Sequence, residues 1–91
     1  MSYVGAHYLF EYVAWFRDES LPPDHQDYEW PGCVWIEAAD SESAQRWGDE
    51  LAKSCPDKFL RSTVEPWLDP VPEGQPFARV GQRLTNAEIG W

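Results

Sequence analysis

Residues 41–55 read SESAQRWGDELAKSC, and they carry the clearest structural pattern in the sequence. Small and apolar residues recur here at helical spacing and form one stripe, made of Ala44, Trp47, Gly48, Leu51, Ala52 and Cys55. Asp40 or Ser41 supplies an N-cap, and Pro56 stops the helix. The pattern predicts one amphipathic helix over about Ser41–Ser54.

Gly48 lies on the apolar stripe of this helix, although glycine costs about 1 kcal/mol of helix propensity relative to alanine. We therefore expect the helix backbone to approach the sheet closely at Gly48, with Trp47 beside it closing the gap.

Three segments around the helix have strand character. Residues 6–17 are rich in aromatic and β-branched residues, and both alternating faces are largely apolar, which is typical of a central strand. Residues 33–39 lead directly into the helix, and residues 58–68 follow it. Pro66 marks the third strand as an edge or as its end. A short fourth strand over 77–84 and a helical turn from Thr85 are also expected.

This order of elements predicts an α+β domain, with a small antiparallel or mixed sheet of three to four strands and one main helix on one face. The first strand fits between the other two, which gives a split βαβ arrangement, half of a ferredoxin-like sheet. Residues 1–91 are expected to form a single domain, with residues 69–91 as a Pro-rich C-terminal arm.

One helix covers only one face of such a sheet. The other face would expose large apolar residues drawn from Leu9, Val13, Trp15, Trp35, Phe59 and Trp67. Monomers rarely leave such a patch open. The Pro-rich arm, a second copy of the chain or a different protein could cover it.

The net charge of −9 is unevenly distributed. Residues 1–31 carry six acids and one arginine, a net −5, and residues 32–57 carry six acids and two bases, a net −4. Residues 58–91 carry four of each sign. Such a surface repels phosphate backbones, so direct nucleic-acid binding is not expected, whereas a basic protein would be attracted. Five of the acids lie in the expected loop 18–31.

The two cysteines, Cys33 and Cys55, match no zinc or redox spacing. No cationic leader or long apolar segment is visible, so the sequence predicts reduced thiols in a cytoplasmic protein without membrane contact. Neither a metal site, nor a cofactor site, nor a nucleophile elbow is recognisable. His7 is the strongest candidate for acid–base work.

The leading hypothesis is a non-enzymatic protein-binding module, such as an inhibitor, an immunity-type protein or an accessory subunit, that engages a larger, basic protein. The predicted contact residues are three apolar anchors and three steering acids: Trp15, Trp35 and Trp67, and Asp24, Asp27 and Glu29. The alternative is a ligand-binding or catalytic homodimer of the α+β barrel type, with His7 in a closed cavity. A third possibility is a purely structural protein whose aromatic face is buried by self-association.

Overall fold

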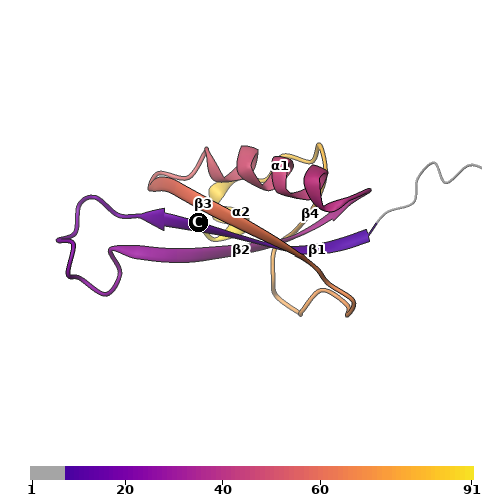
Figure 1. The fold of residues 1–91 in the computed structure, drawn as a ribbon, viewed down its shortest axis with the longest axis horizontal. Helices are drawn as coiled ribbons and strands as arrows, with labels where there is room; N and C mark the ends of the chain where they lie inside the picture. Colours follow the sequence, from indigo (N-terminus) through magenta and orange to yellow (C-terminus); the bar gives the residue numbers. More distant parts are fainter. Residues whose placement is uncertain (1–7) are drawn as a thin grey trace, which may run out of the picture.

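The computed structural model describes residues 8–91, which form one sheet with one main helix on it (Figure 1). The elements in chain order are β1 (Tyr8–Arg17), β2 (Glu29–Ala38), α1 (Ser41–Ala52), β3 (Lys58–Pro66), β4 (Phe77–Arg79) and α2 (Asn86–Ile89). The sheet has 4 strands in the order β3-β1-β2-β4. β1 is antiparallel to β2 and β3, whereas β4 runs parallel to β2. The predicted α+β class with a central first strand is confirmed.

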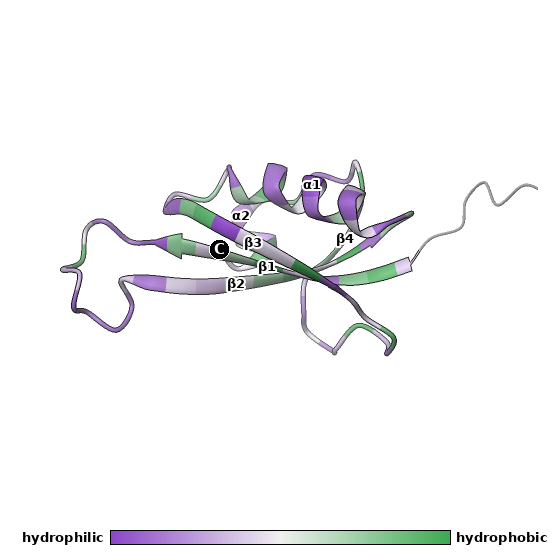
Figure 2. Ribbon diagram, viewed as in Figure 1, coloured by the Kyte–Doolittle hydropathy of each residue, from purple (hydrophilic) through white to green (hydrophobic). Residues whose placement is uncertain are grey.

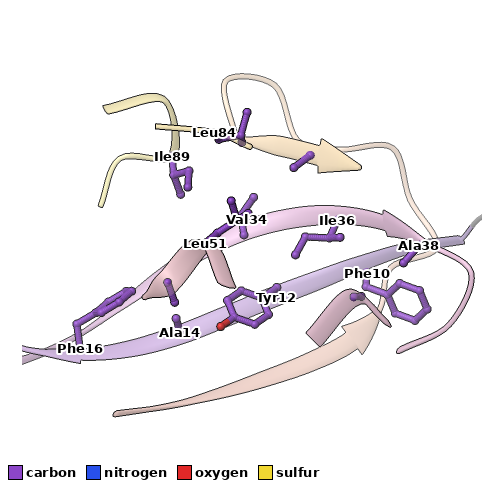
Figure 3. Close-up of a cluster of buried hydrophobic side chains, with 13 residues drawn as sticks. Phe10, Tyr12, Ala14, Phe16, Val34, Ile36, Ala38, Leu51, Leu84 and Ile89 are labelled. Carbon is purple, nitrogen blue, oxygen red and sulfur yellow. The ribbon is translucent and has the colours of Figure 1, made fainter. Parts of the chain in front are cut away.

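The core lies between the sheet and α1 (Figure 3). Alternate residues of β1 and β2 point to this side, because successive side chains in a strand face opposite ways. The strands bury Phe10, Tyr12, Ala14, Phe16, Val34, Ile36 and Ala38, and α1 buries Ala44, Gly48, Leu51 and Ala52. The apolar stripe predicted for the helix is therefore the face that packs on the sheet.

Gly48 rests directly on the ring of Tyr12. A Cβ atom at this position would overlap the ring carbons of Tyr12. The expected close approach is confirmed. Trp47 lies to one side, where its indole Nε1 donates a hydrogen bond of 3.0 Å to the carbonyl of Gln82.

The start of α1 has the expected cap. The Asp40 carboxylate accepts a hydrogen bond of 2.7 Å from the backbone N–H of Ser43. This bond lowers the pKa of Asp40, because it favours the charged form. The helix ends at Ala52, two residues before the predicted Ser54.

β2 begins at Glu29, four residues earlier than the predicted start at Cys33. Pro31 is tolerated inside it for a geometric reason. The N–H of Trp35 donates to the carbonyl of Pro76, so the odd-numbered residues of β2 point their backbone groups toward β4. By alternation, the backbone nitrogen of Pro31 faces the same edge of β2. β4 pairs only with Trp35–Glu37, so no strand lies opposite Pro31, and its missing N–H removes no hydrogen bond of the sheet.

Phe59 lies on the helix side of the sheet, which corrects the expectation that it belongs to the opposite face. The register of β1 and β3 shifts between Trp15 and Phe16, and this irregularity pairs Phe59 with Phe16. The two rings are 6.2 Å apart, and Phe59 packs against the core.

The segment between β3 and β4 crosses the side of the sheet opposite α1 (Figure 1). It starts with a hydrogen bond of 2.9 Å from the Trp67 N–H to the Leu9 carbonyl, and it delivers β4 to the far edge of β2. β4 covers only the first part of the fourth strand predicted over 77–84.

The last residues pack back on the core. Thr85 and Glu88 form the expected capping box of α2. Leu84 and Ile89 are buried, and the Trp91 ring lies 5.1 Å from Phe16, over Gly32. No helix in the described part of the chain is long and apolar enough to cross a membrane.

Candidate functional site

The β1–β2 hairpin ends in an ordered loop, residues 18–28, that projects past both helices (Figure 1). The N–H of Asp18 donates a 2.8 Å hydrogen bond to the Tyr28 carbonyl and closes its base. Inside it, the His25 N–H donates to Pro22 and the Asp27 N–H donates to His25 Nδ1 at 3.0 Å. The loop is therefore held by its own hydrogen bonds, and docking it costs less conformational entropy than docking an unstructured segment.

This loop carries four carboxylates and neither lysine nor arginine, and it is mostly hydrophilic (Figure 2). The carboxylates belong to Asp18, Glu19, Asp24 and Asp27. Hydrogen bonds from the Ser20 hydroxyl and N–H lower the pKa of Asp18. Asp24 and Asp27 are exposed and form no ion pair with any described residue. Their charges are directed at solvent.

Glu29, the third predicted steering acid, has a different environment. Its carboxylate lies 3.7 Å from Arg17 and 3.9 Å from Arg61. Two guanidinium groups therefore offset its charge, so it contributes less to the external field than Asp24 or Asp27. The structure places these three acids in two groups, not in one patch.

The three predicted tryptophan anchors are also placed differently from one another. Trp35 is only 5 % exposed, because Trp67 packs edge-on against it with ring centroids 5.5 Å apart. Trp67 is half-buried and donates from Nε1 to the Pro70 carbonyl at 3.1 Å. Trp15 is half-buried on its own, with the guanidinium of Arg61 at 5.0 Å from its ring. Trp67 therefore covers Trp35 and shields it from solvent.

The sheet face opposite α1, here called the open face, carries charges of both signs and is crossed in part by the segment between β3 and β4 (Figure 1). Alternation assigns it Leu9, Glu11, Val13, Trp15 and Arg17 of β1, Glu29, Pro31, Cys33, Trp35 and Glu37 of β2, and Lys58, Arg61, Thr63 and Glu65 of β3, and Trp67 packs on Trp35. The register pairs Glu11 with Glu65 and Trp15 with Arg61. Glu11 and Glu65 lie toward the end where Trp67 packs on Trp35, whereas Arg17 and Arg61 lie toward the hairpin loop, where Glu29 pairs with both.

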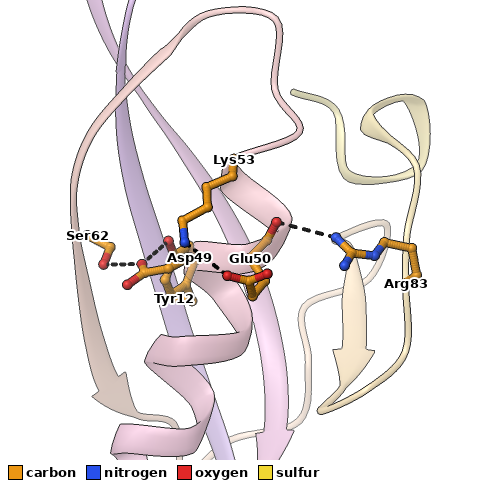
Figure 4. Close-up of polar contacts among 6 residues, drawn as sticks. All are labelled: Tyr12, Asp49, Glu50, Lys53, Ser62 and Arg83. Carbon is orange, nitrogen blue, oxygen red and sulfur yellow. Dashed lines mark hydrogen bonds and ion pairs between the residues drawn. The ribbon is translucent and has the colours of Figure 1, made fainter.

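A polar cluster on the other side of the sheet resembles catalytic chemistry only in composition (Figure 4). Asp49 Oδ1 accepts hydrogen bonds from the Tyr12 hydroxyl at 2.7 Å and from the Ser62 hydroxyl at 2.6 Å. Gln45 donates to Ser62 in turn, at 3.1 Å. Burial raises the pKa of Tyr12, and the bond to Asp49 raises it further. The cluster ties α1 to β1 and β3, and it is a structural clamp.

Two surface clefts accompany these features. A cleft of about 310 Å³ lies at the base of the hairpin, and a smaller one of about 160 Å³ lies beside Trp47. Residues of both charges line the larger cleft: Arg17, Asp18, Glu19, Ser20, Pro56, Asp57 and Lys58. Its polar, mixed lining does not select a ligand class.

The histidine, cysteine and acidic side chains of residues 8–91 were candidates for a further site. Within residues 8–91 no group of three or more His, Cys, Asp or Glu side chains could hold a metal ion. Burial raises the pKa of the Cys33 thiol, and the charge of Glu11 adds to this, so Cys33 is a poor nucleophile. His7, the candidate acid–base residue, lies outside the described residues.

Sequence reasoning missed the role of Arg61, which contacts both Trp15 and Glu29. Nothing in the local pattern of β3 indicates this role, because it depends on the register between β1 and β3. No family model matches this chain, and neither a curated protein nor a solved structure matches it. The function is therefore inferred from the geometry of the chain itself.

Proposed function

We propose that this protein is a protein-binding module whose hairpin loop, residues 18–28, docks on a larger, basic protein. The observation that carries the proposal is the loop itself, which is ordered, projecting and acidic. Asp24 and Asp27 are exposed and free of ion pairs within the described chain. An inhibitor, an immunity-type protein or an accessory subunit would use such a surface.

Electrostatics supports this class of partner. A local excess of one charge accelerates association with a surface of the opposite charge, and the effect weakens as salt screens it. The order within the loop favours binding further, because few backbone torsions remain to be fixed. Trp15 lies in β1, one strand of the hairpin, where it is half-buried on the open face, and it remains the predicted apolar anchor nearest the loop. Trp35 would take part only if Trp67 moved away from it.

Differential capture tests the proposal. The wild-type protein, immobilised, is exposed to extract of its native cell beside the loop variant Asp24→Asn/Asp27→Asn. The control variant Asp69→Asn/Glu73→Gln removes the same number of charges from exposed sites in the segment between β3 and β4.

We expect the wild type and the control to retain the same basic protein and the loop variant to lose it. Equal retention by both variants, or no retained protein at all, would contradict the proposal. The alternative of a ligand-binding or catalytic homodimer depends on His7, and no observation on residues 8–91 favours it.

A further inference from the structure

We infer that His25 is a pH-sensitive switch of the hairpin loop. When its imidazole ring gains a second proton, the outer half of the loop, residues 22–28, loses a hydrogen bond that orders it. The inference deepens the proposed function, and its meaning for binding rests on that function. The switch itself is a property of the free protein and is tested there.

His25 takes part in three of the hydrogen bonds that order the outer half of the loop. Its N–H donates to the Pro22 carbonyl at 2.9 Å, and its carbonyl accepts from the Tyr28 N–H at 3.0 Å. Its side chain adds a third bond, because Nδ1 accepts from the Asp27 N–H at 3.0 Å. Within the described chain, residues 22–27 form no other hydrogen bond. The order of this half therefore depends on His25.

The side-chain bond exists in only one charge state of the ring. A ring nitrogen that accepts a hydrogen bond carries no proton, so the neutral ring of His25 holds its proton on Nε2. In an imidazolium both nitrogens are donors, and Nδ1–H would face the Asp27 N–H. Imidazoles change charge between about pH 5 and 8, whereas ordinary carboxylates stay charged there. Acidification within this range therefore breaks the bond to Asp27.

The charged groups around the ring are mainly the acids of the loop itself. They are Asp18, Glu19, Asp24 and Asp27. Hydrogen bonds from Ser20 lower the pKa of Asp18 most, and the charge of His25 adds to this. Groups of both signs follow at the base of the loop: Arg17, Glu29, Asp57 and Lys58. An imidazolium therefore has negatively charged partners available once it leaves the Asp27 N–H.

Protonation changes the loop in two ways. It removes the hydrogen bond to Asp27, and it adds one positive charge among four carboxylates. Both changes oppose docking on a basic protein, because the loop must be ordered again and the attraction between the two surfaces is weaker. The loop therefore presents its acids most effectively at neutral to alkaline pH.

Hydrogen exchange of the Asp27 amide in the free protein tests the switch. Solvent-exchange NMR would measure this amide in the wild type at about pH 8 and about pH 5.5, with correction for the intrinsic pH dependence of exchange. Protection of the Asp27 amide should fall about fivefold at the lower pH, because one net hydrogen bond is lost. The ladder amides of β1 should keep their protection.

His25→Asn is the matched variant. Asparagine does not titrate, and its Oδ1 accepts from the N–H two residues further on in an Asx turn, as His25 Nδ1 does here. This variant should protect the Asp27 amide equally at both pH values. His25→Ala lacks the acceptor and should show the low protection at both.

Two results would overturn the inference. One is equal protection of the Asp27 amide in the wild type at the two pH values. The other is a fall that also occurs in His25→Asn, because another group would then control the loop. A working switch without a captured basic partner would count against the proposed function alone, whereas a captured partner without the switch would count against this inference alone.

Discussion

The two faces of the sheet come from the same strands and have different properties. The face under α1 is apolar and so closely packed that Gly48 leaves no room for a methyl group above Tyr12. The open face carries exposed Arg61, Thr63 and Glu65 and half-buried Val13 and Trp15, and it holds charges of both signs. The comparison indicates that the helix side provides the stability of the fold. On the other side, the segment that begins at Trp67 covers Trp35, and the hairpin loop projects beyond the packed part of the sheet.

Phe16 and Trp15, adjacent in β1, give the sharpest contrast between the faces. Phe16 is fully buried against Trp30 and Trp91, and Phe16→Ala should lower the free energy of unfolding by about 3–5 kcal/mol. Trp15→Ala should lower it by about 1 kcal/mol, because the ring is covered mainly by Arg61. Urea denaturation of both variants measures the difference. If both variants lost the same free energy of unfolding, the two faces of the sheet would contribute equally to stability.

Gly48→Ala tests the close packing on the helix side. The added methyl group would push against the Tyr12 ring, which costs about 1–3 kcal/mol and outweighs the gain of up to about 1 kcal/mol in helix propensity. Thermal and urea denaturation should both show a less stable protein. A variant as stable as the wild type would show that α1 can shift freely on the sheet.

Tyr12→Phe tests the clamp between α1 and β1. The substitution removes one of the hydroxyl groups that donate to the Asp49 carboxylate, and it should lower the free energy of unfolding by about 1–2 kcal/mol at neutral pH. The folded pKa of Tyr12 is raised above the usual value of about 10, so this contribution to stability is complete below that value and is lost as the pH rises.

The alkaline pH dependence provides the check on this clamp. Urea denaturation at about pH 9 and about pH 11 should show a loss of stability in the wild type that is smaller in Tyr12→Phe. An identical pH dependence in the two proteins would mean that Tyr12 ionises in the folded state as readily as in the unfolded chain.

The N-cap of α1 gives the smallest expected effect. The Ser43 N–H lowers the pKa of Asp40, so the charged cap stabilises the fold above the ordinary aspartate pKa and is lost as the pH falls through the lowered value. Asp40→Asn keeps an acceptor at the cap and removes this titration. Its melting temperature should therefore fall less than that of the wild type on acidification from about pH 5 to about pH 2. If the melting temperatures of the two proteins fell equally on acidification, the charged Asp40 cap would not contribute to the acid dependence of stability.

The sequence was sufficient for features that depend on periodicity. The stripe in α1, the doubly apolar β1 and the place of Gly48 all follow from spacing along the chain, and the structure has them as predicted. Pro66 also ends β3, which is an edge strand.

Features that depend on register were not predictable in the same way. The side of the sheet that Phe59 faces is set by an irregularity opposite Trp15 and Phe16. The start of β2 depends on which edge Pro31 occupies, and the burial of Trp35 depends on where Trp67 crosses the sheet. The charge pairing of Glu29 also needs two neighbouring strands in register. No local pattern contains that information.

We propose that the hairpin loop 18–28 is the element that binds a basic partner. Its most direct test is the association rate of the captured partner with Asp24→Lys/Asp27→Lys, compared with Asp69→Lys/Glu73→Lys, at low and high salt. Reversal in the loop should slow association about tenfold at low salt and flatten its salt dependence, while reversal of Asp69 and Glu73 should change neither. Equal rates for the two variants would contradict the claim.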